Sequence, residues 1–404
     1  MRDRTLWALV LAEVVSSTGS ALTFLALPWF VLATNHGSAT RMSIVLAVEV
    51  LPMALFGIPS GALVARLGSR RTMLLSDGVR APLVALVPIL HWSGDLTFPL
   101  LLVIVFLLGV FITPYISAQR TIIPEVFGDD ERLVSKASGL FGGAVQVPSI
   151  VGPAVAGLLI SWFGTPPLLV VDAVTFLFAF AVVLTLVRGG ARVEQDDASR
   201  GVMAGVRFLT RDKLLGPLTL TLIVLDGSAN AISVAVPLLA FSHYHQDARV
   251  AGWIFMGFGV GAVVGSVAVM KLLDRYRPVR LAAIGMLLVP LPLWSIVAVP
   301  PWPVVAAALF VCGLIVPLVN APMMGILTTR PPAALRAKVM TATLTASGLG
   351  GPGMRLLVGP VFKWHGNMGV WILLAGGMSL GALLFTTAAV RGDARDLQAR
   401  ATIA

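Results

Sequence analysis

Long apolar stretches alternate with short polar ones along the whole 404-residue chain. A helix that crosses the hydrocarbon core of a bilayer needs about 20 mostly apolar residues, and many of these stretches reach that length. The pattern therefore predicts an all-α membrane protein. We expect twelve transmembrane helices, over residues 6–33, 41–65, 72–92, 97–118, 135–162, 167–187, 214–241, 250–272, 280–299, 302–327, 338–362 and 368–390.

The longest polar stretch, residues 188–213, divides these helices into six and six. Its first part, RGGARVEQDDASRG, is typical of a flexible linker, and its second part, GVMAGVRFLTRDKLLG, predicts an amphipathic helix on the membrane surface. We expect three parts: an N-terminal six-helix bundle, a cytoplasmic linker, and a C-terminal six-helix bundle with a short cytoplasmic tail. Their bounds are 1–188, 189–213 and 214–404.

Basic residues are distributed unevenly between the predicted loops. With the N-terminus in the cytoplasm, 24 of the 29 lysines and arginines lie on the cytoplasmic side, and only Arg41, Arg249 and Lys363 lie outside. This asymmetry follows the positive-inside rule, so both termini are expected in the cytoplasm. Glu13 interrupts the first apolar run, and no small-residue cleavage site follows it, which predicts an uncleaved first helix rather than a signal peptide.

The composition supports the membrane assignment. The chain is 57% hydrophobic and 12% charged, about half the charged share of a typical soluble protein. The topology accounts for the net charge of +10, so a nucleic-acid partner is not expected. Cys312 is the one cysteine, which excludes an internal disulfide. Arginines outnumber lysines 24 to 5, a bias typical of GC-rich bacterial genomes. Together with the long apolar stretches, this bias leads us to expect a protein of a bacterial inner membrane.

Two pairs of segments repeat between the halves of the chain. SGLFGGAVQVPSIVGPAVAG, from Ser138, is similar to SGLGGPGMRLLVGPVF, from Ser347, and LVARLGSRRTML is similar to LLDRYRPVRL. Repeated six-helix halves are typical of secondary transporters, whose substrate site lies between the repeats near the bilayer midplane. Three GxxxG pairs also predict close helix packing: Gly57 with Gly61, Gly139 with Gly143, and Gly261 with Gly265.

The loop between the second and third predicted helices resembles the signature of the major facilitator superfamily, Gly-x-Leu-Ala-Asp-Arg-x-Gly-Arg followed by Arg or Lys. Ala65 replaces the signature aspartate, which in that family helps to latch the outward-open state. The resemblance thus implies a weakened latch in the first half, which Asp274 and Arg275 of the equivalent second-half loop partly replace. The matching residues of this gating motif are Gly61, Leu63, Arg66, Gly68 and Arg70, with Arg71 beside them.

A second motif, Gly152-Pro153-x-x-x-Gly157, resembles the antiporter motif of drug/proton exporters. ALPWFVLATNHGSA, LLSDGVRAPLV, RTIIPEV and GVRFLTRDKLL resemble the macrolide-efflux branch of those exporters. The resemblance implies two six-helix repeats around a central cavity and alternating access. It also implies proton-coupled export of lipophilic small molecules such as antibiotics, by a protein that is not an enzyme and acts as a monomer.

Ionisable residues inside predicted helices are the candidates for proton coupling and substrate binding. A carboxylate that faces lipid is too costly to keep, so each should face a cavity or a partner, or form a neutral hydrogen bond between helices. Arg355 either binds an anionic group or pairs with one of the acids. Asp77 and Arg80, three residues apart on one helix, predict a structural ion pair, with a gating role as the alternative. The acidic candidates are Glu13, Glu49 and Asp226.

Uncharged polar and methionine side chains complete the candidate substrate lining, although packing in the core or against lipid is the alternative for each. They are Asn230, Asn320, Gln146, Tyr115 and Met323. An excess of acids over arginines in the cavity favours a cationic or zwitterionic substrate. The sequence contains no nucleotide-binding P-loop and no Cys/His metal cluster, so neither ATP nor another cofactor is expected. A lysophospholipid flippase, a proton-coupled importer and a non-transporting membrane sensor stay open.

Overall fold

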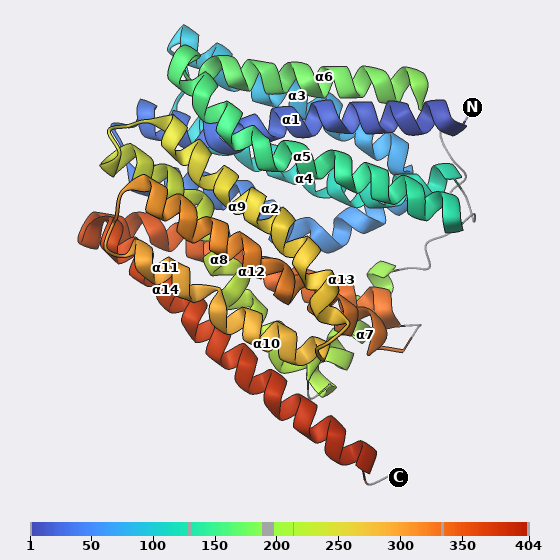
Figure 1. Ribbon diagram of the computed structural model, residues 1–404. Coiled ribbons are helices and arrows are strands. Elements are labelled where there is room, and N and C mark those ends of the chain that lie inside the picture. The colour runs from blue at the N-terminus through green and yellow to red at the C-terminus, as the bar shows by residue number, and fades with distance from the viewer. Residues whose placement is uncertain (1, 128–130, 188–197, 213, 333–334, 402–404) are drawn as a thin grey trace. The chain divides into compact units, whose positions relative to one another are not determined.

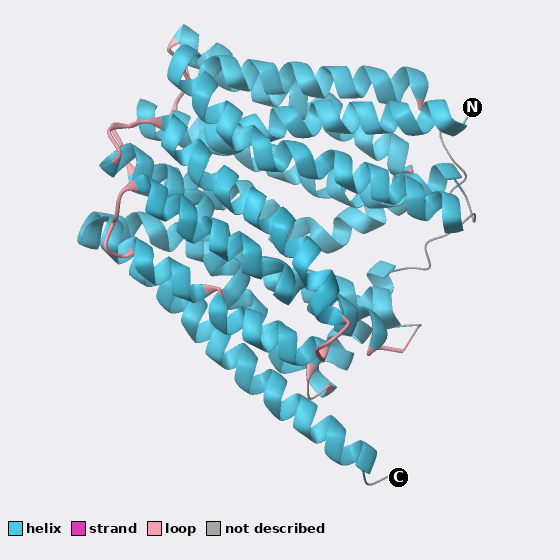
Figure 2. Ribbon diagram, viewed as in Figure 1, coloured by secondary structure: helices cyan, strands magenta, loops and turns pink. Residues whose placement is uncertain are grey.

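The computed structural model describes residues 2–127, 131–187, 198–212, 214–332 and 335–401. Within these ranges every regular element is a helix and no strand occurs (Figures 1 and 2). Helices are expected in lipid because they satisfy all backbone N–H and C=O groups within one segment. Residue 188, which ends the predicted N-terminal bundle, and residues 189–197 and 213 of the predicted linker lie outside the described residues.

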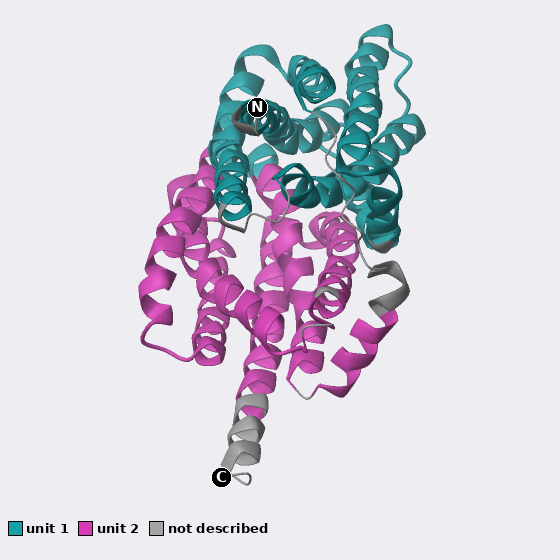
Figure 3. Cartoon of the chain, turned by 90° about the vertical axis from the view of Figure 1, so that its right-hand side faces the viewer, with its two compact units in different colours: residues 1–199, 240–252 teal, residues 200–239, 253–404 magenta. Residues whose placement is uncertain are grey.

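The chain forms two compact units, which Figure 3 shows in different colours. The first contains residues up to 199 together with residues 240–252. In this unit α1 packs against α5 and α6, α2 packs against α4, and α3 packs against α4 and α6. Figure 1 shows α1, α3 and α6 running side by side. The helices are α1 (Arg2–Thr34), α2 (Ala39–Leu67), α3 (Ser69–Ser93), α4 (Phe98–Phe127), α5 (Glu131–Phe163) and α6 (Pro166–Leu186).

The second unit contains residues 200–239 and those from 253 onward. In this unit α10 and α11 pack against α12 and α14, and α13 contacts both α12 and α14. The remaining helices are α7 (Ala198–Arg211), α8 (Leu215–His243), α9 (Ala248–Leu273), α10 (Pro278–Leu288), α11 (Pro290–Ile296), α12 (Trp302–Thr329), α13 (Arg336–Gly348) and α14 (Gly350–Ala401).

Two of the expected single helices are interrupted. The span predicted at 280–299 is divided between α10 and α11, because Pro290 lacks a backbone N–H and its ring disfavours a continuous helix. The span predicted at 338–362 is divided between α13 and α14 at Leu349. Within α14, Gly366 adopts a non-helical conformation with φ 62° and ψ −159°, which glycine tolerates because it has no Cβ.

Eleven segments of the described chain are long and apolar enough to cross a membrane. The α10–α11 pair counts as one of them, Pro278–Ile296. The last segment, Lys338–Arg391, counts once although it has 54 residues. A straight helix of that length measures about 80 Å, against a hydrocarbon core of about 30 Å.

Glycines allow close approach of helix backbones in the second unit. A Cβ built on Gly261 or Gly265 would collide with the carbonyl oxygens of Phe310 or Leu314 on α12, so the predicted packing role of this pair is confirmed. The other two GxxxG pairs differ. In the described part of the chain, nothing lies within 4 Å of a Cβ built on Gly57, Gly61, Gly139 or Gly143.

Several tryptophans lie exposed at or near helix ends. Trp92 and Trp162 lie near the C-terminal ends of α3 and α5, Trp302 begins α12, and Trp364 precedes the break at Gly366. Tryptophan is enriched where a membrane meets water, because its ring is apolar and its N–H is polar. These positions therefore suit the ends of membrane-spanning segments.

Candidate functional site

Glu13 is buried in α1, where its carboxylate accepts two hydrogen bonds from α4. Only 3% of the residue is exposed. The Tyr115 hydroxyl donates to Glu13 Oε2 over 2.9 Å, and the Gln119 side-chain amide donates to Oε1. Tyr115 and Gln119 lie one turn apart on α4, so both donors reach the same carboxylate. The predicted candidates Glu13 and Tyr115 are thus brought together, whereas Gln119 was missed.

Arg80 lies on α3 beside this pair and is 5% exposed. Its Nη1 lies 3.7 Å from Asp77 Oδ1, so the predicted ion pair is present. Its guanidinium carbon lies 3.9 Å from the centre of the Phe176 ring on α6 and 5.3 Å from that of Tyr115. An arginine over an aromatic face is attracted by the ring quadrupole, most strongly where water is excluded. Arg80 therefore links α3 to α4 and α6.

Asp172, on α6, is a buried acid that sequence reasoning missed. It is 1% exposed, and Oδ2 accepts a hydrogen bond of 2.6 Å from the Thr23 hydroxyl on α1. Gly19 permits this approach, because a Cβ there would collide with Asp172 and Thr175. The sequence could have indicated this residue, since Asp172 is an acid inside the predicted span 167–187. The first unit thus buries three carboxyl groups that interact electrostatically with Arg80, those of Glu13, Asp77 and Asp172.

In the second unit, Asp226 lies half-buried on α8. The Ser347 hydroxyl of α13, which donates to the Leu344 carbonyl over 3.2 Å, also interacts with the Asp226 carboxyl group. Asn230, one turn later, donates its side-chain amide to the Asp226 backbone oxygen over 2.8 Å. Next to Asp226, Gly227 packs against the Gly350 carbonyl, so α8 and the start of α14 approach closely. The acid therefore lies where three helices of this unit meet.

The other candidates are dispersed within their units. Glu49 is half-buried on α2, where Gly109 of α4 packs against its backbone oxygen. Arg355 is buried on α14. Among the lining candidates, Met323 is buried, while the exposed ones are Gln146, Asn230 and Asn320.

The gating-motif loop is held by residues that sequence reasoning did not identify. Glu125 of α4 accepts hydrogen bonds from the Ser69 backbone N–H (3.1 Å) and hydroxyl (2.5 Å), at the start of α3. A carboxylate is favourable there because it satisfies donors at a helix N-terminus. Arg70 Nε donates to the Val187 carbonyl over 2.6 Å and Nη2 to that of Leu184 over 2.8 Å. Residues with exposed side chains are Ala65, Arg66, Arg71, Asp274 and Arg275.

Gly68 separates α2 from α3 by a single residue with φ 82°. This is the left-handed region, which residues with a Cβ adopt only under strain. Its backbone N–H donates to the Val64 carbonyl over 2.7 Å and so ends α2. The glycine of the motif therefore makes the sharp turn between the two helices.

The antiporter-motif glycines mark close contacts inside the first unit. A Cβ on Gly152 would collide with Ala21 of α1, and one on Gly157 would lie 2.5 Å from the Ala248 carbonyl oxygen. Gly252 approaches the Pro153 carbonyl in the same way. The motif therefore packs α5 against α1 and against residues 240–252.

Asp212 joins three elements at the end of α7. Its Oδ1 accepts hydrogen bonds from the backbone N–H groups of Leu214 (2.9 Å) and Leu215 (2.8 Å), which caps α8. Arg330, just after α12, donates its Nε to Oδ2 over 2.9 Å. Partial burial alone would raise the pKa of Asp212, but these hydrogen bonds and the guanidinium outweigh it and lower the pKa.

Comparison with known proteins places this site in context. The family model described as Major Facilitator Superfamily matches residues 9–353. The multidrug efflux pump Tap of Mycolicibacterium fortuitum is 28% identical over 380 residues, covering 91% of each chain. Macrolide efflux protein A of Streptococcus pyogenes is 22% identical over 380 residues, covering 92% of each.

Solved structures of other proteins share the fold. The nucleoside transporter NupG superposes with a TM-score of 0.80 at 14% identity, covering 95% of this chain and 98% of its own. A bacterial homologue of the lysosomal transporter Spinster, in an inward-facing and unoccupied conformation, gives 0.71 at 13% identity, covering 97% and 96%. At these identities the likeness concerns the fold alone.

Proposed function

The chain belongs to the major facilitator superfamily, and from this premise we propose that it exports lipophilic small molecules in exchange for protons. It is a multi-pass membrane transporter and not an enzyme. Relatives named as a multidrug efflux pump and a macrolide efflux protein support drugs or antibiotics as the substrate class. We place the protein in the bacterial cell membrane, with both termini in the cytoplasm.

The observation that carries proton coupling is the setting of Glu13. A carboxyl group buried inside a membrane-spanning helix is rarely kept without a function. Both groups that donate to it, from Tyr115 and Gln119, are uncharged, so these two hydrogen bonds do not pair the carboxylate with a cation. A group in this setting can take up a proton when substrate leaves and release it when substrate binds. Asp226 beside Ser347 is the corresponding candidate in the second unit.

The acids also bear on substrate charge. The first unit buries the carboxyl groups of Glu13, Asp77 and Asp172 around one guanidinium, that of Arg80. An excess of acidic groups in a site from which water is excluded favours a cation over an anion. A lipophilic cation or zwitterion is therefore the preferred substrate class.

For the architecture, we propose twelve membrane-spanning helices in two repeats. Lys338–Arg391 is long enough for two spans, and the break at Gly366 lies close to where the second would begin. The packing supports the repeat: α3 contacts α4 and α6 in the first unit, as α10 and α11 contact α12 and α14 in the second. Alternating access would then expose a cavity between the repeats to each side in turn.

Transport into proteoliposomes with an imposed pH gradient tests the proposal. Glu13→Gln and Asp226→Asn keep the side-chain shape but cannot ionise. We expect each to abolish substrate accumulation against its gradient and to leave downhill exchange. Asp95→Asn is a matched control, because Asp95 is an exposed loop acid. Full gradient-driven transport by the Glu13→Gln, Asp226→Asn double variant would contradict coupling through these two carboxyl groups.

A further inference from the structure

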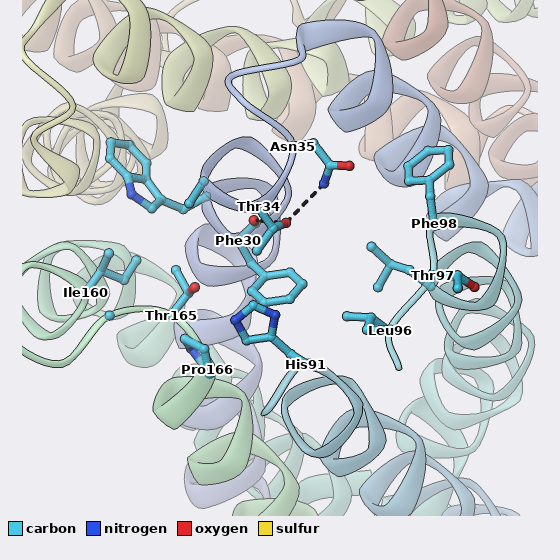
Figure 4. A pocket seen from close by; sticks show the side chains of 14 residues that line it. Phe30, Thr34, Asn35, His91, Leu96, Thr97, Phe98, Ile160, Thr165 and Pro166 are labelled. Carbon is cyan, nitrogen blue, oxygen red and sulfur yellow. Dashed lines mark hydrogen bonds between the residues drawn. The ribbon is translucent and has the colours of Figure 1, made fainter. Parts of the chain in front are cut away.

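A cavity of about 590 Å³ lies in the first unit, near the C-terminal ends of α1, α3 and α5. We call it the His91 pocket. Figure 4 shows Phe30 and His91 at its centre, with Thr97 and Phe98 on one side and Thr165 on the other. Phe30 follows Glu13 by 17 residues on α1, which corresponds to about 25 Å along the helix. The pocket is therefore separate from the carboxyl groups to which proton coupling is assigned.

Aromatic rings form much of its wall. Phe30 and His91 meet edge to face, with ring centres 5.1 Å apart, and Trp29 and Phe98 also line the space. The Trp29 ring also packs edge to face against Phe241, with ring centres 5.5 Å apart. Rings held in place by other rings offer fixed apolar surfaces on which a flat aromatic ligand can stack.

Apart from the His91 imidazole, the polar side chains of the wall are hydroxyls and an amide. Hydroxyls come from Thr34, Thr97 and Thr165, and an amide comes from Asn35. No Asp, Glu, Lys or Arg is among the described residues that line the pocket. Hydroxyl and amide groups both donate and accept hydrogen bonds, so they match the carbonyl and hydroxyl groups of a neutral molecule.

Arg41 stands beside the pocket and argues against a cationic ligand. Its Nη1 donates to Asn35 Oδ1 over 2.6 Å, and its guanidinium lies over Phe98 at 5.2 Å from the ring centre. With one cation next to the wall and no carboxylate in it, a second cation would gain no counter-ion and would meet a like charge.

We propose that the His91 pocket binds an uncharged aromatic molecule of drug size that carries hydrogen-bonding groups. The volume falls within the range of small-molecule sites, about 300–1,000 Å³, and the mixture of aromatic walls with a few polar groups is typical of them. The pocket thus differs from the buried carboxyl groups of Glu13, Asp77 and Asp172, for which we proposed a preference for cations. Binding there does not depend on proton coupling.

Cysteine protection in the purified full-length protein, reconstituted in nanodiscs, tests the proposal with chloramphenicol as the uncharged aromatic probe. Thr97→Cys places a thiol in the pocket wall, and Ser93→Cys places one on the exposed chain just before it. Cys312 is buried, so background labelling by a maleimide is low. Saturating chloramphenicol should slow labelling of Thr97→Cys at least about threefold and leave Ser93→Cys unchanged. No slowing, or equal slowing at both positions, overturns the proposal.

Direct binding of radiolabelled chloramphenicol gives the second measurement. Phe98→Leu should weaken binding about 2- to 10-fold, the effect expected from one aromatic contact. Phe163→Leu is the matched control, because Phe163 is an exposed neighbour outside the pocket. Tetraphenylphosphonium, an aromatic cation, and 4-nitrobenzoate, an aromatic anion, should not protect Thr97→Cys; protection by either instead of chloramphenicol overturns the charge assignment.

The transport variants separate this proposal from the proposed function. The Glu13→Gln, Asp226→Asn double variant should keep chloramphenicol protection of Thr97→Cys whether or not it still couples transport to protons. Loss of protection in that variant would show that the two sites are not separate, and would overturn the inference even if proton coupling holds.

Discussion

Arg80 links its own helix α3 to α4 and α6 through one side chain. It pairs with Asp77 on its own helix and lies over Phe176 and near Tyr115 on α6 and α4. A buried carboxylate that loses its cationic partner still carries the free-energy cost of desolvation, but it no longer gains the attraction of the cation. Removing one partner of a buried pair therefore lowers the free energy of unfolding by about 3–5 kcal/mol. The stability of this unit therefore depends on the balance between the charge of Arg80 and those of the buried carboxyl groups, and not on one contact alone.

We expect Arg80→Gln to destabilise the purified protein by about 3–5 kcal/mol, because Asp77 is left without its partner. Adding Asp77→Asn removes the orphaned charge and should restore part of the loss. Thermal unfolding in detergent measures both. A double variant that is as unstable as Arg80→Gln alone would show that lost packing on Phe176, and not charge balance, causes the effect.

Asp212, which lies outside the membrane-spanning segments, makes a pH-dependent contribution to the free energy of unfolding. Its pKa is lowered in the folded protein, so its contribution is present above the ordinary aspartate pKa of about 3.9 and is lost as the pH falls through the lower folded value. At pH 7 we expect Asp212→Ala to cost about 0.5–2 kcal/mol, the usual effect of replacing a helix-capping residue by alanine. The difference from wild type should shrink below about pH 4. A difference that stays constant from pH 7 to pH 3 would contradict this assignment.

At the scale of helices, the antiporter-motif glycines act through backbone contact rather than through chemistry. Gly157 packs on the backbone of Ala248 and Arg249, and Arg249 Nε donates to Ser161 Oγ over 2.8 Å. The close fit leaves no room for a side chain at position 157. This contact joins α5 to the start of α9.

Gly157→Val should therefore separate α5 from this segment. Inserting methyl groups into such a contact costs about 1–3 kcal/mol, which thermal unfolding detects. Labelling of a Ser161→Cys thiol should also become faster. Gly143→Val is the control on the same helix, because nothing in the described chain lies within 4 Å of a Cβ there. Equal destabilisation by both variants would mean that helix propensity, not the contact, is responsible.

The sequence predicts helices well and contacts between helices poorly. Apolar runs determine which segments can enter lipid, so the expected spans mostly coincide with observed helices. The separation of α10 from α11 was missed although Pro290 could have indicated it. The hydrogen bonds of Glu13 with Gln119, and of Glu125 with Ser69, depend on how each helix is rotated about its axis. A single sequence, read on its own, does not determine that rotation. The pairing of Asp77 with Arg80 was predictable because it lies within one helix.

For the whole molecule, the predicted orientation in the membrane rests on charge, since 24 of 29 basic residues fall on one side of the predicted topology. Arg71 and Ser93 lie at opposite ends of α3, and both are exposed. Ser69 is a poor labelling position, because it is buried and bonded to Glu125.

An impermeant maleimide applied to intact cells should label Ser93→Cys and should reach Arg71→Cys only after the cells are permeabilised. Since α3 crosses the membrane once, the two positions must give opposite results if the helix spans. The native Cys312 is buried, so the unmodified chain serves as the background control. Labelling of Arg71→Cys but not Ser93→Cys in intact cells would invert the topology. It would place the Arg66–Arg71 loop, with its three arginines, on the external side against the positive-inside rule.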